Sequence, residues 1–406
     1  MYRPGYNRWL HWFAVLTALS TLVLIGIGGL VTSHGVGMAV PDWPTTYGYN
    51  MFAFPVSQWV GGIFYEHTHR LVASTVGLLV VALTRWLGGR PSRLPLAIIG
   101  AGEAVAGLVL LQLGGSWKGA GHFLSGIGGV VLLAALVWAR NEPGRRSLSQ
   151  WGWTAFVLVQ FQGLLGGLRV MLFKDEIGIF HAALAQIFFL LLCVIALGTS
   201  RWWHQQQTFG AGPDRTKGVR RLVLVTTCLI LGQLLLGATM RHQHAGLAIP
   251  DFPLAYGKVW PAFDTASVAQ YNRQRLEIAG ENPITAFQIG LQMAHRFIAL
   301  LISCLVAGCA WSSWRKLGSK HLLSKGSVAW VCLILSQVIL GAATIWSTKA
   351  ADIATGHVLL GAASLVLGGL LSLVSYWDLF LAEDSATVRT PADGFQPLPS
   401  AAATAK

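Results

Sequence analysis

Long apolar runs, separated by short polar connections, make up most of this chain of 406 residues. Ten of the runs are roughly 20 residues long, the length that a helix needs to cross the hydrocarbon core of a bilayer. The predicted spans lie near residues 12–32, 67–87, 94–113, 121–139, 152–172, 179–199, 220–240, 286–311, 327–347 and 354–376. The pattern therefore predicts an all-α polytopic membrane protein with about ten transmembrane helices.

The composition excludes an ordinary soluble protein. Only 11% of the residues are charged and 54% are hydrophobic, whereas soluble domains carry about 25% charged residues. All five cysteines fall within apolar runs and none has CxxC spacing, which argues against a zinc site and against an external disulfide. A disordered chain and a small scaffold stapled by disulfides are excluded as well.

The formal net charge of +13 is explained by the places where the basic residues lie. Lys and Arg gather in alternate connections, and the segment 33–65 has none, so the positive-inside rule places both termini in the cytoplasm. We therefore expect a multi-pass protein of the bacterial inner membrane, embedded in the lipid bilayer, with no nucleic-acid partner. The polar residues 379–406 are expected to form a disordered cytoplasmic tail.

An internal repeat divides the chain. Three motifs occur twice in the same order, the first at a constant offset of 209 residues. The pairs are GVGMAVPDWPTTYG (35–48) with HAGLAIPDFPLAYG (244–257), EHTHRLVAS (66–74) with QMAHRFIAL (292–300), and QGLLGGLRV (162–170) with QVILGAATI (337–345). Each half has an even number of spans, which predicts two parallel four-helix-bundle repeats, residues 1–205 and 206–378. Residues 94–139 have no counterpart and are interpreted as an inserted helical hairpin.

Four histidines occupy matched positions in the spans of the two halves: His69, His181, His295 and His357. A lone histidine in such a helix is more often an interhelical hydrogen-bonding contact, but four at repeat-related positions favour a function. Two imidazoles from facing helices of a bundle can hold a haem iron axially, whereas zinc or copper would need further ligands. The pattern predicts two haems, one in each half, with iron bound through these four residues.

The halves differ beside the first histidine of each pair. Glu66 stands three residues before His69, while Gln292 has the equivalent position before His295. A carboxylate in one half and an amide in the other suggest chemistry in the first half and electron relay in the second. The alternative is that Glu66 only stabilises the N-terminal end of its helix.

Other matched residues allow a functional and a structural interpretation. Arg70 and Arg296 could bind haem propionates or extend toward the membrane surface. The Pro-Asp-aromatic-Pro loops could cover the haems, or Asp42 and Asp251 could simply cap turns. Small residues in the third motif should allow close approach of a helix or a haem: Gly163, Gly166, Gly167, Gly341, Ala342 and Ala343. We expect the remaining histidines near these loops to lie at the outer surface: His34, His67, His242 and His244.

These residues together resemble the haem A synthase family, membrane enzymes that convert haem O to haem A for terminal oxidases. The resemblance covers nearly the whole chain apart from the hairpin and the tail. Its most specific element is the E-x-x-H-R motif of Glu66, His69 and Arg70, combined with the QGLLGGLRV motif and the spacing to His181. Many family members carry a cysteine pair in the outer loops, which 33–65 and 241–285 lack.

The resemblance implies roles for these residues. It implies that His69 and His181 flank the substrate haem O, that Glu66 is the catalytic carboxylate, and that His295 and His357 ligate haem b. The family reaction oxidises the C8 methyl group of haem O through a hydroxymethyl stage to a formyl group, with haem b relaying electrons. The partners implied are the farnesyltransferase that makes haem O and a redox partner such as a quinone; a homo-oligomer is a further candidate.

Two other functions are compatible with the pattern. A dihaem cytochrome b could transfer electrons from quinol without modifying either haem, with Glu66 as a proton acceptor. A transporter could also be built from repeated halves with polar groups in the membrane, but neither half has a clearly broken helix. We rank the synthase first and the transporter last.

Overall fold

The computed structural model describes residues 6–137, 146–205, 213–274 and 283–387, and in these segments it is built from helices, turns and two isolated β-bridges. Ten helices there are long and apolar enough to cross a membrane. They are α1 (Arg8–Ser33), α2 (Gly61–Gly88), α3 (Arg93–Leu113), α4 (Lys118–Val137), α5 (Arg146–Leu172), α6 (Asp175–Gly198), α8 (Pro213–His242), α10 (Ala286–Leu317), α11 (Leu322–Trp346) and α12 (Ala351–Thr387). The prediction of an all-α protein with ten spans is confirmed. Two shorter helices, α7 (Arg201–Gln205) and α9 (Thr265–Gln274), lie in connections.

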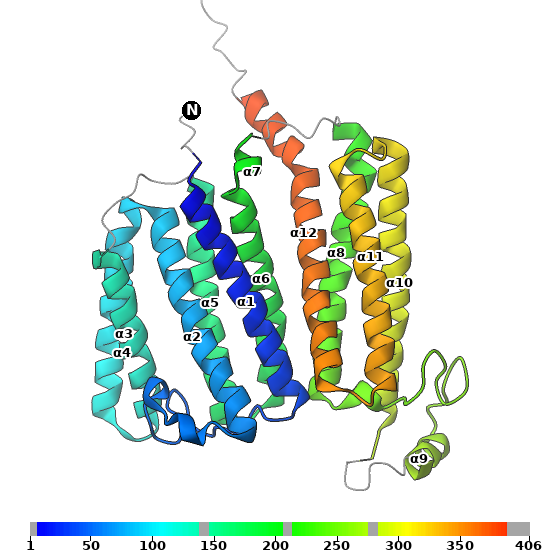
Figure 1. Ribbon diagram of the computed structural model, residues 1–406, viewed down its shortest axis with the longest axis horizontal. Helices are drawn as coiled ribbons and strands as arrows, with labels where there is room; N and C mark the ends of the chain where they lie inside the picture. The colour runs from blue at the N-terminus through cyan, green and yellow to red at the C-terminus, as the bar shows by residue number, and fades with distance from the viewer. Residues whose placement is uncertain (1–5, 138–145, 206–212, 275–282, 388–406) are drawn as a thin grey trace, which may run out of the picture.

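Eight of the long helices form two closed rings of four (Figure 1). In the first ring α1 packs on α2, α2 on α5, α5 on α6 and α6 on α1; in the second ring α8, α10, α11 and α12 pack in the same cyclic order. The rings meet where α1 contacts α12 and where α6 contacts α8 and α12. Each ring has an apolar core of its own. The division of the chain into two repeats stays a prediction.

The helices α3 and α4 form the predicted inserted hairpin, beside α2 and α5 (Figure 1). Their backbones touch, because glycines line both sides of the contact: Gly100, Gly107, Gly121 and Gly128. A Cβ atom added at Gly107 would lie only 2.3 Å from the backbone nitrogen of Ser125. The hairpin is therefore a tightly packed unit attached to the edge of the first ring.

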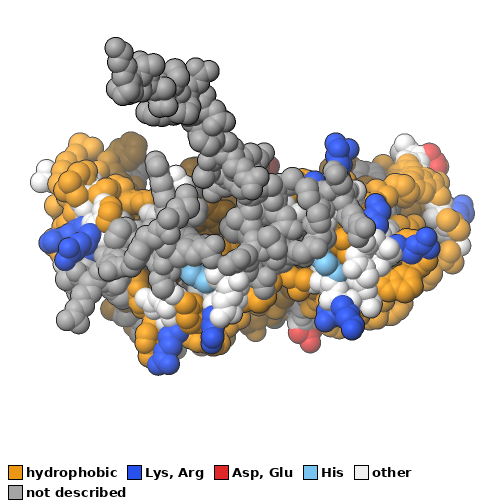
Figure 2. Space-filling view, turned by 90° about the horizontal axis from the view of Figure 1, so that it is seen from above, with side chains coloured by type: hydrophobic (Ala, Val, Ile, Leu, Met, Phe, Trp, Pro, Cys, Tyr) orange, Lys and Arg blue, Asp and Glu red, His pale blue; other side chains and the backbone are white. Residues whose placement is uncertain are grey.

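The helix α1 begins and α12 ends at the same end of the molecule (Figure 1), as an even number of spans requires. Figure 2 shows this end, where Lys and Arg side chains interrupt the hydrophobic ones. The helix α12 continues to Thr387, into the segment 379–406 that was predicted to be a disordered tail. The rest of that segment lies outside the described residues. The long loops that follow α1 and α8 both lie at the opposite end, which we call the loop end.

Each of these loops contains the same turn, in which an aspartate accepts two backbone N–H groups through its two carboxylate oxygens. The sets are Asp42 with Tyr47 and Gly48, and Asp251 with Tyr256 and Gly257, at 2.7 and 2.8 Å in both loops. The prediction that Asp42 and Asp251 cap turns is confirmed. Burial raises the pKa of Asp42, but hydrogen bonds from Gly48, Thr45 and Tyr47 outweigh it, so the pKa lies below its ordinary value.

Candidate functional site

The four matched histidines lie on helices at opposite corners of the two rings. His69 is on α2 and His181 on α6; His295 is on α10 and His357 on α12. Because α2 and α6 are separated by α1 on one side and α5 on the other, a histidine on each can face the other across the bundle interior. His69 and His181 lie on diagonally placed helices of the first ring, and His295 and His357 lie on diagonally placed helices of the second. The structure thus brings the predicted residues together as two pairs.

A glycine on the neighbouring helix lies against each of these imidazole rings. The distances from a Cβ added at the glycine to Cε1 of the ring are 3.0 Å for Gly28 and His69, 3.6 Å for Gly166 and His181, 3.3 Å for Gly237 and His295, and 3.4 Å for Gly341 and His357. In each ring of four helices, two opposite helices therefore carry a histidine and the other two carry a glycine. The absence of side chains at the glycines leaves room beside the imidazoles.

Sequence reasoning singled out Gly166 and Gly341 but missed Gly28 and Gly237. The missed pair has the same offset of 209 residues as the loop motif, so extending the repeat backward into the preceding span would have found it. A further missed feature is the glutamines that donate to histidine carbonyl oxygens, at distances of 2.9 to 3.1 Å: Gln162 to His181, Gln233 to His295 and Gln337 to His357. These glutamines fix the backbone at three of the four positions.

The chemistry of the four imidazoles fits axial ligation of a porphyrin iron. In each imidazole Nδ1 is buried and has no hydrogen-bond partner in the described part of the chain, while the histidine side chain as a whole is only half-buried. This leaves Nε2 as the nitrogen that can reach an iron. No cluster of three or more His, Cys, Asp or Glu residues occurs within the described ranges, so a site with several protein ligands is not formed there. Two imidazoles in each ring of helices match the two axial ligands that a haem iron can take.

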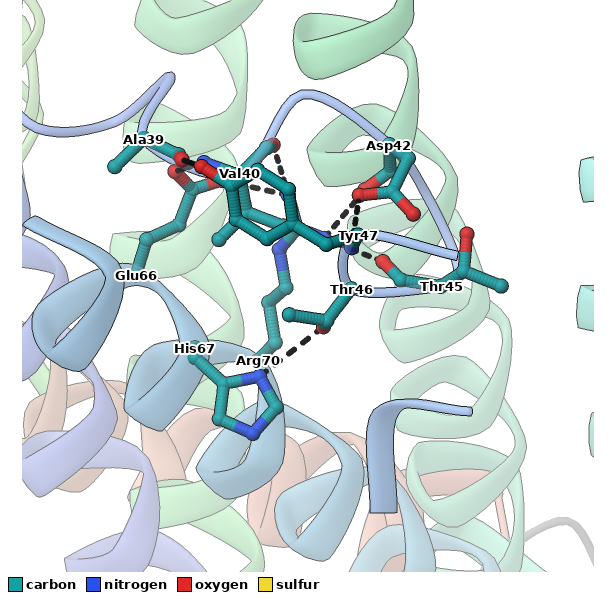
Figure 3. Close-up of polar contacts among 9 residues, drawn as sticks. All are labelled: Ala39, Val40, Asp42, Thr45, Thr46, Tyr47, Glu66, His67 and Arg70. Atoms are coloured by element: carbon teal, nitrogen blue, oxygen red, sulfur yellow. Dashed lines mark hydrogen bonds and ion pairs between the residues drawn. The ribbon is translucent and has the colours of Figure 1, made fainter. Parts of the chain in front are cut away.

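Glu66 is buried and connects α2 to the first loop (Figure 3). Its Oε2 accepts a hydrogen bond of 2.9 Å from the backbone N–H of Val40, and its Oε1 accepts one of 2.7 Å from Nη2 of Arg70. The second contact is an ion pair between residues one helical turn apart. Two of the roughly four lone-pair sites of the carboxylate are used in this way, and the others remain free to accept a proton.

Gln292 makes the equivalent contacts in the second ring. Its Oε1 accepts a hydrogen bond of 2.6 Å from the backbone N–H of Ile249, and its Nε2 lies 3.3 Å from the carbonyl oxygen of the same residue. In the first ring the corresponding carbonyl, that of Val40, accepts instead from Arg70 at 2.8 Å. In the first ring Glu66 and Arg70 together bind the N–H and the carbonyl oxygen of Val40. In the second ring Gln292 alone binds both groups of the equivalent residue, Ile249.

The two arginines that were predicted to bind either propionates or the membrane surface are engaged with the loops. Arg70 donates to the carbonyl oxygens of Asp42 and Thr45 at 2.6 and 3.1 Å, besides its contacts to Val40 and Glu66. Arg296 donates to the carbonyl oxygens of Asp251 and Leu254 at 2.7 and 2.8 Å. Their role toward propionates stays a prediction.

His67 was expected near the outer surface, and the structure places it at the loop end, buried beneath the first loop. The side chain is fully buried, and its Nδ1 lies 3.1 Å from Oγ1 of Thr46. The ring packs against Phe54 and Trp59, with centroid distances of 5.1 and 4.7 Å. No periodic pattern indicates this burial, because the loop that covers His67 is irregular. His67 contacts the first loop through Thr46.

Comparison with known proteins agrees with this architecture. The chain is 22% identical to the Heme A synthase of Lysinibacillus sphaericus (strain C3-41) over 94% of its own length and 97% of that protein's. It is 24% identical to the Heme A synthase of Geobacillus kaustophilus (strain HTA426) over 86% of each chain. For the Heme A synthase of Alkalihalophilus pseudofirmus the identity is 21%, over 92% of this chain and 97% of the relative.

A family model described as cytochrome oxidase assembly protein, COX15-CtaA, matches residues 116–368. The match includes three of the paired histidines, the glutamines that fix them, and the second ring up to residue 368 of α12. It begins after Glu66 and His69, so the match does not cover these two residues. Since the matched region is more than half of the sequence, the chain belongs to the COX15-CtaA family of cytochrome oxidase assembly proteins.

Proposed function

We propose that this protein is a haem A synthase, which converts haem O to haem A in the membrane. The observation that carries the proposal is the pair of rings with histidines at two opposite corners and glycines at the other two. Each ring can then accept one planar porphyrin between two imidazoles. Membership of the COX15-CtaA family and the names of the relatives support the same conclusion.

The first ring is proposed to bind haem O as substrate and the second to hold haem b as cofactor. His69 and His181 would position the substrate, and His295 and His357 would retain haem b, which when bound supplies a one-electron redox centre. The difference that favours this assignment is Glu66, since the second ring has an amide at the same position. A carboxylate can take up a proton during oxidation of a methyl group, whereas an amide cannot.

In the proposed reaction the C8 methyl group becomes first a hydroxymethyl and then a formyl group. Each stage removes two electrons from the substrate, and the oxygen atom comes from water or from dioxygen. Glu66 would accept a proton released at the methyl carbon or its hydroxyl, using a lone pair that Val40 and Arg70 leave free. With water as the oxygen source, the two electrons of each stage would pass to a redox partner such as a quinone. With dioxygen as the source, dioxygen takes up four electrons per stage, so the redox partner would have to supply the other two. The farnesyltransferase that makes haem O would supply the substrate.

A dihaem electron-transfer protein is the second candidate. The observation in its favour is that Gln292 and Glu66 hold their loops in nearly the same way. The role of Glu66 can therefore be structural, with no part in a reaction. In that case both rings would hold permanent haems and neither haem would be changed.

The deciding experiment is mass spectrometry of haems extracted from a host that lacks haem A and co-expresses this protein with a haem O-producing enzyme. We expect haem A or hydroxylated haem O. A variant with both His69 and His181 changed to Ala is the control, and it should yield unaltered haem O. If the intact protein is folded and loaded with haem but yields only haem B and unaltered haem O, the electron-transfer function is favoured.

A further inference from the structure

Cationic side chains gather where α8 ends, at the junction between the two rings. Arg241 and His242 are the last two residues of α8. Nη2 of Arg241 reaches α1 of the other ring, where it donates to the carbonyl oxygen of Gly29 at 2.6 Å and to Oγ of Ser33. Nε of Arg241 is buried and has no hydrogen-bond partner within the described residues.

The charge of Arg241 lacks a carboxylate counterpart in the described part of the chain, since both of its acceptors are neutral. Arg70, by contrast, is neutralised by Glu66. A half-buried guanidinium at the end of an apolar helix is costly unless an anion pairs with it. The partial negative charge at the C-terminus of α8 offsets only part of this cost. The arrangement is thus suited to a bound anion.

The cations at this junction lie beside both histidine pairs. Arg241 lies about one helical turn after Gly237 on α8, and a Cβ added at Gly237 would lie 3.3 Å from Cε1 of His295 in the second ring. His242, and Arg169 near the end of α5, both approach Gly178, which lies about one helical turn before His181 on α6.

Gly178 of α6 brings two of these cations together. A Cβ added there would lie 2.5 Å from Cε1 of His242 and 3.0 Å from Nε of Arg169. The side chains of His242 and Arg169 therefore lie close to each other beside Gly178 of the first ring, while Arg241 lies beside the second ring. The C-terminal end of α8 thus contributes a cation to each ring.

We propose that the loop end of α8 is a carboxylate-binding junction for two porphyrins. Arg241 binds a carboxylate of the porphyrin held by His295 and His357. Arg169 and His242 bind a carboxylate of the porphyrin held by His69 and His181. The proposal rests on the proposed function, because it requires a porphyrin in each ring. Porphyrins of the haem class carry two propionates, and a planar guanidinium can bind a carboxylate with two parallel hydrogen bonds.

This assignment differs from the prediction for Arg70 and Arg296. Arg70 uses both terminal nitrogens of its guanidinium for loop carbonyls and for Glu66, so binding a propionate would cost these contacts. Arg241 keeps a buried donor without a partner. Because Arg241 and His242 are adjacent in sequence, the carboxylate edges of both porphyrins would point toward the boundary between the rings.

The test uses full-length protein produced without haem, in a variant with His69 and His181 both changed to Ala so that only the second pair can bind. Ferric haem B and its dimethyl ester are titrated separately, and binding is followed by the Soret band of a low-spin, bis-histidine haem. The ester keeps the iron and the ring but has no carboxylate. We expect haem B to bind at least about tenfold more tightly than the ester, and Arg241→Gln to abolish this preference.

Two further variants distinguish the pairing of Arg241 with a carboxylate from its hydrogen bonds to α1 of the other ring. Ser33→Ala removes a neutral partner of Arg241 and should leave the preference for haem B unchanged. Arg241→Lys keeps the charge and should retain most of it, even if Arg241→Gln fails to fold. Equal affinities for haem B and the ester, or equal weakening of both by Arg241→Gln, would overturn the junction but leave the proposed function intact. Failure of either porphyrin to give a bis-histidine spectrum would instead contradict the proposed haem site, and the junction with it.

Discussion

Glu66 and Gln292 hold equivalent loop residues by the same hydrogen bond: Oε2 of Glu66 accepts from the N–H of Val40, and Oε1 of Gln292 accepts from the N–H of Ile249. The amide performs in the second ring the structural task that the carboxylate performs in the first. An amide at position 66 should therefore hold the first loop as well. Glu66→Gln therefore tests the chemistry of the carboxylate while the hydrogen bond to the N–H of Val40 can be kept.

Glu66→Gln should keep the fold and the content of haem b but lower product formation by about 100-fold or more, the usual contribution of a general acid or base. The measurement is the yield of haem A by mass spectrometry beside the visible spectrum of the purified protein. Gln292→Glu is not a matched control, because it replaces the Nε2 donor that faces the carbonyl oxygens of Gly246 and Ile249 with an acceptor; it should loosen the second loop. Unchanged turnover in Glu66→Gln would remove Glu66 from the mechanism.

His295→Ala should deplete haem b, because one of its two proposed axial ligands is lost. His69→Ala, in the equivalent position of the first ring, should leave haem b in place and abolish conversion of haem O. The haem b content per protein is measured by a pyridine haemochrome assay. Normal haem b in His295→Ala would refute the assignment of the second ring.

Gly237→Val should expel haem b or distort its spectrum. Even a Cβ at this position would lie 3.3 Å from Cε1 of His295, so a branched side chain must displace the ring. Gly232→Val on the same helix is the control, since nothing lies within 4 Å of its added Cβ. Both changes place a β-branched residue in α8, and only the first should alter the low-spin spectrum; equal effects would mean that the helix itself is at fault.

Gly107→Leu should loosen the α3–α4 hairpin. The side chain would collide with the backbone of α4, and overpacking of this kind costs about 1–3 kcal/mol or more. Gly102→Leu lies in the same helix with open space around its Cβ and should be tolerated. Thermal unfolding in detergent and proteolysis of the hairpin compare the two variants. The hairpin contact would be judged unimportant if both variants unfold at the same temperature.

Acid should open the first loop through Asp42. Because the pKa of Asp42 is lower in the folded protein than its ordinary value of 3.8, the carboxylate stabilises the loop fully above that value. This contribution is lost as the pH falls through the lower folded pKa. The protection of the Tyr47 and Gly48 amides from hydrogen exchange, measured relative to the intrinsic rate at each pH, should fall below about pH 4. In Asp42→Asn the protection should depend little on pH in this range, and a similar acid response in that variant would exclude Asp42 as the cause.

The sequence predicted the spans and the histidine pairs because both depend on periodic features: apolar length and a repeat that restores the same residue at the same depth. It could not predict what Glu66 and Arg70 contact, since an irregular loop determines those partners. The burial of His67 could not be predicted for the same reason. Arg241 escaped notice because its partners, Gly29 and Ser33, lie about 210 residues away in the sequence and outside any repeat.

The residues that hold each loop surround a histidine on the same helix: Glu66 and Arg70 flank His69, and Gln292 and Arg296 flank His295. A rotation of α2 that swings His69 away from an iron must also break the contacts to Val40 and Asp42. Release of a proposed porphyrin and opening of the loop would thus be coupled. The loop is held by an ion pair in the first ring and by an amide in the second, so the two proposed porphyrins would differ in how readily they leave.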